Sequence, residues 1–255
     1  MRRQNRLKTG IPGLDKMLEG GLIPERPYVI SGPAGSGKTT LGMQFLLEGL
    51  HTGERVLFVA LEEPPNEIKQ NMEALDLKVG GVEILDANSD IRRYEPTPVM
   101  EISPKRWVTR MREISPEIRK TSRYKSIVVS VHSLQTTLKH ELRRTKYKRM
   151  VLDSLTALRF FCMVSDEEVH LQSFLRFLSE SKITCLLTVE TPEEYGLTPE
   201  IFLARGEIRL HKAREKDRIR RMISVEKLRG SDHDDRTHPM EIKKGDGVVV
   251  LSSDI

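Results

Sequence analysis

A glycine-rich segment near the N-terminus constrains the fold of this chain more than any other part of its sequence. The segment GPAGSGKT, from Gly32 to Thr39, fits the pattern G-x-x-x-x-G-K-[ST] at every specified position. An apolar run, PYVIS (27 to 31), comes directly before it, and a helix is predicted to begin at Lys38. A strand, a glycine-rich loop and a helix in this order are typical of P-loop nucleotide-binding proteins. The segment therefore predicts an α/β fold built around a phosphate site.

The residue types in this loop suit the phosphates of ATP or ADP. Glycines let backbone N–H groups curl around phosphate oxygens, and the helix N-terminus adds the positive end of its dipole. Lys38 is expected to reach the β- and γ-phosphates, and the Thr39 hydroxyl is expected to ligate Mg²⁺. The predicted nucleotide-binding residues are Gly32, Pro33, Ala34, Gly35, Ser36, Gly37, Lys38, Thr39 and Thr40.

Carboxylates follow two other apolar runs. Asp153 ends the run RMVLD, where a second Mg²⁺-binding group is expected, acting through a water molecule. Glu62 and Glu63 follow the run RVLFVAL, at the same edge of a doubly wound sheet, where a carboxylate can orient or deprotonate the attacking water. Each group also has a structural interpretation, because Asp at a strand end often caps a helix and paired glutamates often lie in solvated loops. The phosphate loop favours the catalytic interpretation.

Short apolar runs alternate with helix-length segments between residues 27 and 190. This alternation predicts a mostly parallel sheet with helices on both faces. Helices are predicted to begin at Lys38, Pro64 and Asp166. The predicted strands span residues 27 to 31, 55 to 61, 82 to 87, 149 to 154 and 184 to 190.

The pattern changes after residue 205 to strand-like runs with alternating polarity. The last two runs, MEIKK and GVVVLS, are joined through Gly245-Asp246-Gly247, which indicates a β-hairpin. We therefore expect the C-terminal edge of the sheet to be antiparallel. The chain is expected to form one domain, residues 1 to 255, in which residues 89 to 126 are a candidate mobile insertion because they combine four prolines with many charges.

Charge and composition limit the location and the partners. The formal net charge is +5, but residues 104 to 149 hold 14 Lys or Arg against 3 Asp or Glu, so this block is +11 and the remainder is −6. Such a block attracts nucleic acid, forms a solvated face or contributes to a subunit interface. No apolar run approaches the ~20 residues that span a bilayer. The basic N-terminus MRRQNRLK is not followed by an apolar h-region, so we expect a cytoplasmic protein. The two cysteines, Cys162 and Cys185, lack CxxC spacing and are interpreted as small buried residues in a reducing compartment.

Several segments together resemble the KaiC-like branch of the RecA superfamily. They are TGIPGLDKMLEGGL, GPAGSGKTT, FVALEEPP, MVLDSLTAL and VEKLRGSDH, which occur in that order between residue 9 and about residue 242. The first and last are specific to this branch, whereas the phosphate loop alone is not. The chain resembles a single-domain form of the family.

The resemblance implies a RecA-like core that assembles as a hexameric ring, with ATP between neighbouring subunits. Glu62 and Glu63 match the paired catalytic glutamates of the family. Lys227 and Arg229 match residues that reach the γ-phosphate of the neighbour's ATP, and His233 matches a position near the nucleotide. Cations donated across an interface would stabilise charge on the transferring phosphoryl group.

The sequence also departs from the family. The clock protein that names the family has two tandem copies of this domain, whereas this chain holds one. Its phosphorylated copy carries a Ser-Thr pair where this chain has Ile201 and Phe202, and Thr198 is the nearest hydroxyl. Autophosphorylation is therefore not favoured.

Three hypotheses for the function follow. The first is a ring ATPase whose slow hydrolysis sets a conformational state that a protein partner reads. The second is a nucleic-acid-associated ATPase that uses the basic segments 105 to 125 and 214 to 221, for which we expect weak binding at most because aromatic residues for base stacking are few. The aromatic residues of the basic regions are Trp107, Tyr124 and Tyr147. The third is a kinase that transfers the phosphoryl group to itself or to a partner.

Overall fold

The computed structural model describes residues 6–87, 131–161, 167–191, 199–215 and 218–251. The predicted insertion, residues 89 to 126, lies outside these ranges, as do Cys162, Asp166 and Thr198. Cys185 is buried, as predicted.

Nine strands of the described chain form one mixed sheet in the order β3-β2-β4-β5-β1-β6-β7-β8-β9. The parallel part comprises β3 (Glu83–Asp86), β2 (Val56–Ala60), β4 (Arg149–Asp153), β5 (Thr184–Glu190), β1 (Pro27–Gly32) and β6 (Gly206–Glu215). The antiparallel part adds β7 (Arg218–Leu228), β8 (His238–Lys243) and β9 (Gly247–Val250). The expected parallel sheet with an antiparallel C-terminal edge is confirmed, including the hairpin between β8 and β9.

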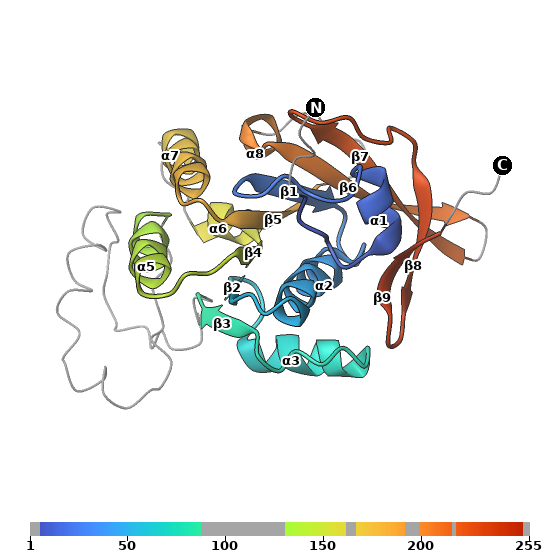
Figure 1. Ribbon diagram of the computed structural model, residues 1–255, viewed down its shortest axis with the longest axis horizontal. Coiled ribbons are helices and arrows are strands. Elements are labelled where there is room, and N and C mark those ends of the chain that lie inside the picture. The colour runs from blue at the N-terminus through green and yellow to red at the C-terminus, as the bar shows by residue number, and fades with distance from the viewer. Residues whose placement is uncertain (1–5, 88–130, 162–166, 192–198, 216–217, 252–255) are drawn as a thin grey trace, which may run out of the picture.

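Helices cover both faces of the sheet (Figure 1). One face carries α1 (Pro12–Met17), α2 (Lys38–His51) and α3 (Pro65–Ala74), and the other carries α5 (Val131–Arg144), α6 (Leu155–Phe161) and α7 (Glu167–Glu180). Neighbouring residues of each central strand alternate between the two apolar cores, as Val29 and Ile30 do in β1. Every residue of β1 and β2 is buried, which is why their sequences lack polar alternation.

The predicted helix starts agree closely with the described ones. α2 begins at Lys38, and α3 begins at Pro65 with Pro64 as its N-cap. The short helices α1, α6 and α8 (Pro199–Leu203) were not predicted, because fewer than eight residues give about two turns and little helical periodicity. The 14-residue helix α5 was also not predicted, although Val131, Leu134 and Leu138 have helical spacing. None of the helices within the described ranges combines the length and the apolar character needed to cross a membrane.

Candidate nucleotide-binding site

The loop between β1 and α2 has a backbone that its glycines make possible. Gly32, Gly35 and Gly37 have φ values of +148°, +68° and +109°, which other residues rarely adopt. A Cβ on Gly32 would lie 2.4 Å from the carbonyl oxygen of Leu210 on β6, so this strand leaves no space for a side chain. The buried Ser36 hydroxyl has no hydrogen-bond partner in the described structure. A buried polar group without a partner fits a loop that closes around phosphate oxygens.

Lys38 lies folded over this loop. Its ammonium group donates hydrogen bonds to the carbonyl oxygens of Gly32 at 2.9 Å and Pro33 at 3.0 Å. Burial lowers the pKa of Lys38, while the negative charges of Glu190, Asp153 and Glu62 oppose that effect. The site therefore gathers one half-buried cation and three carboxylates at the carboxyl edge of the parallel strands, where nucleotides bind in such sheets.

Asp153 ends β4 next to β2, and its carboxylate lies against two threonines. The Thr188 hydroxyl donates to Asp153 Oδ1, and Thr39 donates a further side-chain hydrogen bond. Burial raises the pKa of Asp153, and these hydrogen bonds oppose the shift. The two predicted Mg²⁺-binding residues, Thr39 and Asp153, are thus in contact, and their oxygen donors suit this cation.

Glu62 and Glu63 follow β2 and lie near Asp153. Glu62 accepts a hydrogen bond from the Ser154 hydroxyl. Although Glu62 as a residue is exposed, partial burial of its carboxyl group raises its pKa, and the charges of Asp153 and Glu190 act in the same direction. Glu63 accepts a hydrogen bond from Asn71 on α3 at 3.0 Å, and its charge raises the pKa of Asp153. Carboxylates with a raised pKa are better proton acceptors.

Replacing both Glu62 and Glu63 by Gln is expected to lower kcat for ATP hydrolysis by about 100-fold or more, with little change in ATP affinity. Neutral amides keep the shape of the site but cannot accept a proton from water. Phosphate release and equilibrium ATP binding measure the two effects. The matched control is Glu67→Gln, an exposed carboxylate on α3. Parent-like phosphate release from a folded double variant would remove the two glutamates from the mechanism.

Sequence analysis missed Glu190, which the structure places beside the loop. Glu190 ends β5 and is paired in register with Gly32 of β1. Its charge is the strongest electrostatic influence on Lys38 after burial. The signal was available, because Glu190 ends the run TCLLTVE just as Asp153 ends RMVLD.

Two cations of the β6–β7 hairpin also contact the loop and were missed. Lys212 donates to the carbonyl oxygen of Ala34 at 3.2 Å, and the Arg221 guanidinium donates to that of Gly35 at 3.4 Å. The alternation of polar and apolar residues could not predict these contacts. They depend on the pairing of β6 with β1 and of β7 with β6.

Lys227 and Arg229 lie away from the phosphate loop of their own chain. The Arg229 backbone pairs with Arg205, which pairs with Pro27 at the start of β1, whereas the loop follows the end of that strand. Five residues of strand span about 17 Å. The Lys227 ammonium instead donates to the carbonyl oxygens of Ile201 at 2.7 Å and Phe202 at 3.0 Å on α8.

The remaining predicted residue, His233, follows β7. Its Nδ1 is buried and has no hydrogen-bond partner in the described part of the chain. The next residue, Asp234, donates its backbone N–H to the carbonyl oxygen of Met17 at the end of α1. None of the contacts described for His233 joins it to the phosphate loop of the same chain.

The fold and the loop define a P-loop protein of the RecA type, in which β1, the glycine loop and α2 meet the carboxylates that follow β2 and β4. A family model described as "ATPase: KaiC" matches residues 7–255. The chain belongs to the KaiC ATPase family, which is a family of ATP-binding proteins.

Relatives extend over nearly the whole chain. A UPF0273 protein of Thermotoga maritima is 34% identical over 260 residues, covering 98% of this chain and 97% of that protein. The circadian clock protein KaiC3 of Synechocystis is 31% identical over 253 residues, covering 96% of this chain but 45% of KaiC3. The crystal structure of a KaiC-like protein from Pyrococcus horikoshii OT3 superimposes with a TM-score of 0.74 at 24% identity, covering 97% of this chain and 99% of that one. This structural match supports the fold.

Proposed function

We propose that this chain binds ATP in the loop from Gly32 to Thr40 and hydrolyses it with Mg²⁺. The observation that carries the proposal is the meeting of Lys38 with Asp153 and Glu62 at one edge of the sheet. Four adjacent strands, β2, β4, β5 and β1, supply this edge, so the arrangement depends on the fold rather than on a flexible loop.

The residues of the site divide the work of hydrolysis. The loop N–H groups and the Lys38 ammonium bind the phosphates, and Glu62 and Glu63 orient the water and accept its proton. The water oxygen bonds to the γ-phosphorus while the bond to the β–γ bridging oxygen breaks, which releases ADP and phosphate. Mg²⁺, held by Thr39 and through water by Asp153, would neutralise phosphate charge.

We also propose that the protein works as a ring, with hexamers as the expected form. Lys227, Arg229 and His233 would then act on the ATP of a neighbouring subunit. Support comes from Lys227 and Arg229, which lie toward the start of β1 and so are remote from their own phosphate loop. A head-to-tail contact would bring this surface to the loop of the next subunit, and repetition of such a contact closes a ring.

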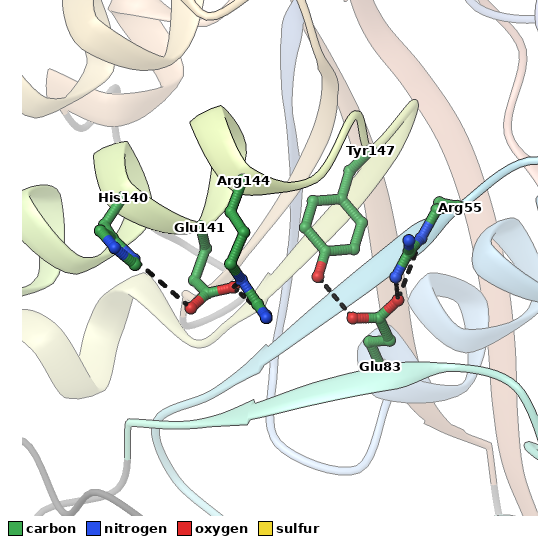
Figure 2. A network of polar contacts seen from close by, with 6 residues as sticks. All are labelled: Arg55, Glu83, His140, Glu141, Arg144 and Tyr147. Carbon is green, nitrogen blue, oxygen red and sulfur yellow. Dashed lines mark hydrogen bonds and ion pairs between the residues drawn. The ribbon is translucent and has the colours of Figure 1, made fainter.

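The ring would serve regulation or signalling in the cytoplasm, through a protein partner that reads the nucleotide state. Nucleic acid is the alternative partner, and the described part of the basic block offers it little support. The Arg144 guanidinium pairs with Glu141 at 2.8 Å. The Tyr147 hydroxyl donates a hydrogen bond to Glu83, which also pairs with Arg55 from outside the block (Figure 2). Of these two arginines only Arg144 belongs to the block, and its contact with Glu141 gives it a structural partner.

A second cation of the block, Arg149, is buried and not exposed to solvent. Arg149 lies in the core, where it pairs with Glu54 at 2.5 Å and donates to the carbonyl oxygens of Lys8 and Phe45. Lys139 packs over the ring of Phe177 at 5.4 Å. Both contacts favour structural roles for this part of the block.

Three measurements separate the three hypotheses: the fate of labelled phosphate, the oligomeric mass and the binding of single-stranded DNA. ATP labelled at its γ-phosphate is incubated with the protein, and oligomeric mass is measured with and without nucleotide. We expect the label in free phosphate and a larger assembly with ATP. Label on the protein would favour the kinase hypothesis. Binding of single-stranded DNA that survives physiological salt would favour the second, because non-specific binding weakens steeply as salt rises.

A further inference from the structure

A buried carboxylate of the sheet lies close to both Lys227 and the strand that precedes the phosphate loop. The proposed mechanism of hydrolysis does not use it. Glu207, on β6, is only 5% exposed, and a buried carboxylate persists only where it is paired or hydrogen-bonded. The fully buried hydroxyl of Ser31 donates to Glu207 Oε1 at 2.5 Å. Ser31 directly precedes Gly32, so Glu207 is hydrogen-bonded to the end of β1, where the phosphate loop begins.

Lys227 is the cross-strand partner of Glu207. The two residues are paired in register on β6 and β7, and the register shifts between Glu207 and Ile208. Such a β-bulge re-aims side chains locally. Paired residues on adjacent strands have Cβ atoms about 5 Å apart, so the two side chains leave the sheet next to each other. Glu207 thus lies beside the cation that the proposed function assigns to the neighbouring subunit's ATP.

Among the described groups whose charge shifts the pKa of Lys227, Glu207 is the one anion, although α8 also carries the fully buried carboxyl group of Glu200 next to Ile201. Burial lowers the pKa of Lys227 most, and the positive charges of Arg229 on β7 and Arg205 before β6 lower it further. Only the charge of Glu207 acts in the opposite direction. From α8, the carbonyl oxygens of Ile201 and Phe202 accept the hydrogen bonds of the ammonium.

We propose that Glu207 is a positioning residue whose carboxylate, anchored by Ser31, holds the Lys227 ammonium against α8 as a cation. The proposal rests on the proposed function only where Lys227 is assigned to a neighbour's ATP. Without Glu207, the ammonium would lose the negative charge that opposes the effect of Arg229 and Arg205 on its pKa. It would then lose its proton at a lower pH and would no longer stabilise charge on a phosphoryl group.

The test is the pKa of Lys227, read from the ¹³Cε resonance in protein that carries labelled lysine and assigned by its loss in Lys227→Arg. Glu207→Gln preserves the shape and still accepts the Ser31 hydrogen bond, and we expect the pKa of Lys227 to fall by about one pH unit. The double variant Ser31→Ala, Glu207→Met replaces the polar pair with apolar groups of similar volume and should give the same fall. If Glu207→Gln folds poorly, the double variant provides the test of the proposal.

The matched control is Glu226→Gln. Glu226 directly precedes Lys227 on β7, but its carboxylate accepts a hydrogen bond from Ser224 and lies 3.9 Å from His211. The pKa of Lys227 should not move in this variant. An unchanged pKa in Glu207→Gln, or an equal fall in Glu226→Gln, would overturn the proposal.

Hydrolysis supplies a second readout. In Glu207→Gln, kcat should begin to fall at a lower alkaline pH than in the parent, by about one pH unit, while KM for ATP changes little. Adding Lys227→Arg should restore the alkaline activity, because a guanidinium keeps its charge. If Lys227→Met hydrolyses ATP like the parent, Lys227 has no role in hydrolysis. The pKa of Lys227 measured by NMR would still test the effect of Glu207 independently.

Discussion

Lys38→Ala is expected to weaken ATP binding by about 100-fold, or about 2.7 kcal/mol, and to abolish hydrolysis at concentrations that saturate the parent. Lys38 is the one side-chain cation within the loop from Gly32 to Thr39. Its ammonium already lies against the loop carbonyl oxygens of Gly32 and Pro33, so it needs only a local change of rotamer to face phosphates. Charge-assisted hydrogen bonds to phosphate are among the strongest in proteins.

Isothermal titration with ATP measures this effect, and thermal unfolding checks that the variant is folded. Lys69→Ala is the matched control, because it removes an exposed lysine from α3 and leaves the loop intact. Equal ATP affinity in Lys38→Ala and the parent would contradict the assignment of the phosphate loop.

The centre of this site could be predicted because its chemistry is local in the sequence. The motif from Gly32 to Thr39 encodes strand, loop and helix at once, and Asp153 and Glu62 directly follow apolar strands. Parallel strands then bring their carboxyl ends together, so one rule was enough to place these three features at one edge. In the structure, the charges of Lys38, Asp153 and Glu62 influence one another's pKa values.

The other residues near the site could not be predicted, because their positions depend on which strands are neighbours in the sheet. A single sequence does not determine the strand order by a simple rule. Glu190 lies beside Lys38 because β5 pairs with β1, and Lys212 reaches Ala34 because β6 pairs with the other side of β1. The Ser31–Glu207 contact joins residues that are 176 positions apart. Glu207 in the run GEIRLHKA reads as a solvated position of an alternating strand, yet it is buried.

The ring hypothesis leads to the second large effect, which is recovery of activity from two inactive variants. An Arg229→Ala subunit keeps an intact loop, Asp153 and glutamate pair, because Arg229 lies near the start of β1. A Glu62→Gln, Glu63→Gln subunit has an inactive pocket but keeps Arg229. In a head-to-tail ring each pocket is completed by one neighbour, so mixed rings contain some complete sites. Hydrolysis should return to at most about a quarter of the parent rate for random mixing.

The informative control pairs two defects that lie in the same pocket. Lys38→Ala mixed with the Glu62→Gln, Glu63→Gln variant should show no recovery, since each subunit then carries a defective pocket whichever neighbour it has. Steady-state phosphate release is measured for each variant alone and for each mixture after subunit exchange, with mixed rings verified by mass. Recovery in both mixtures would point to general stabilisation by assembly. No recovery with Arg229→Ala in verified mixed rings would mean that Arg229 acts within its own subunit or not at all, although its own phosphate loop lies about 17 Å away along the strand.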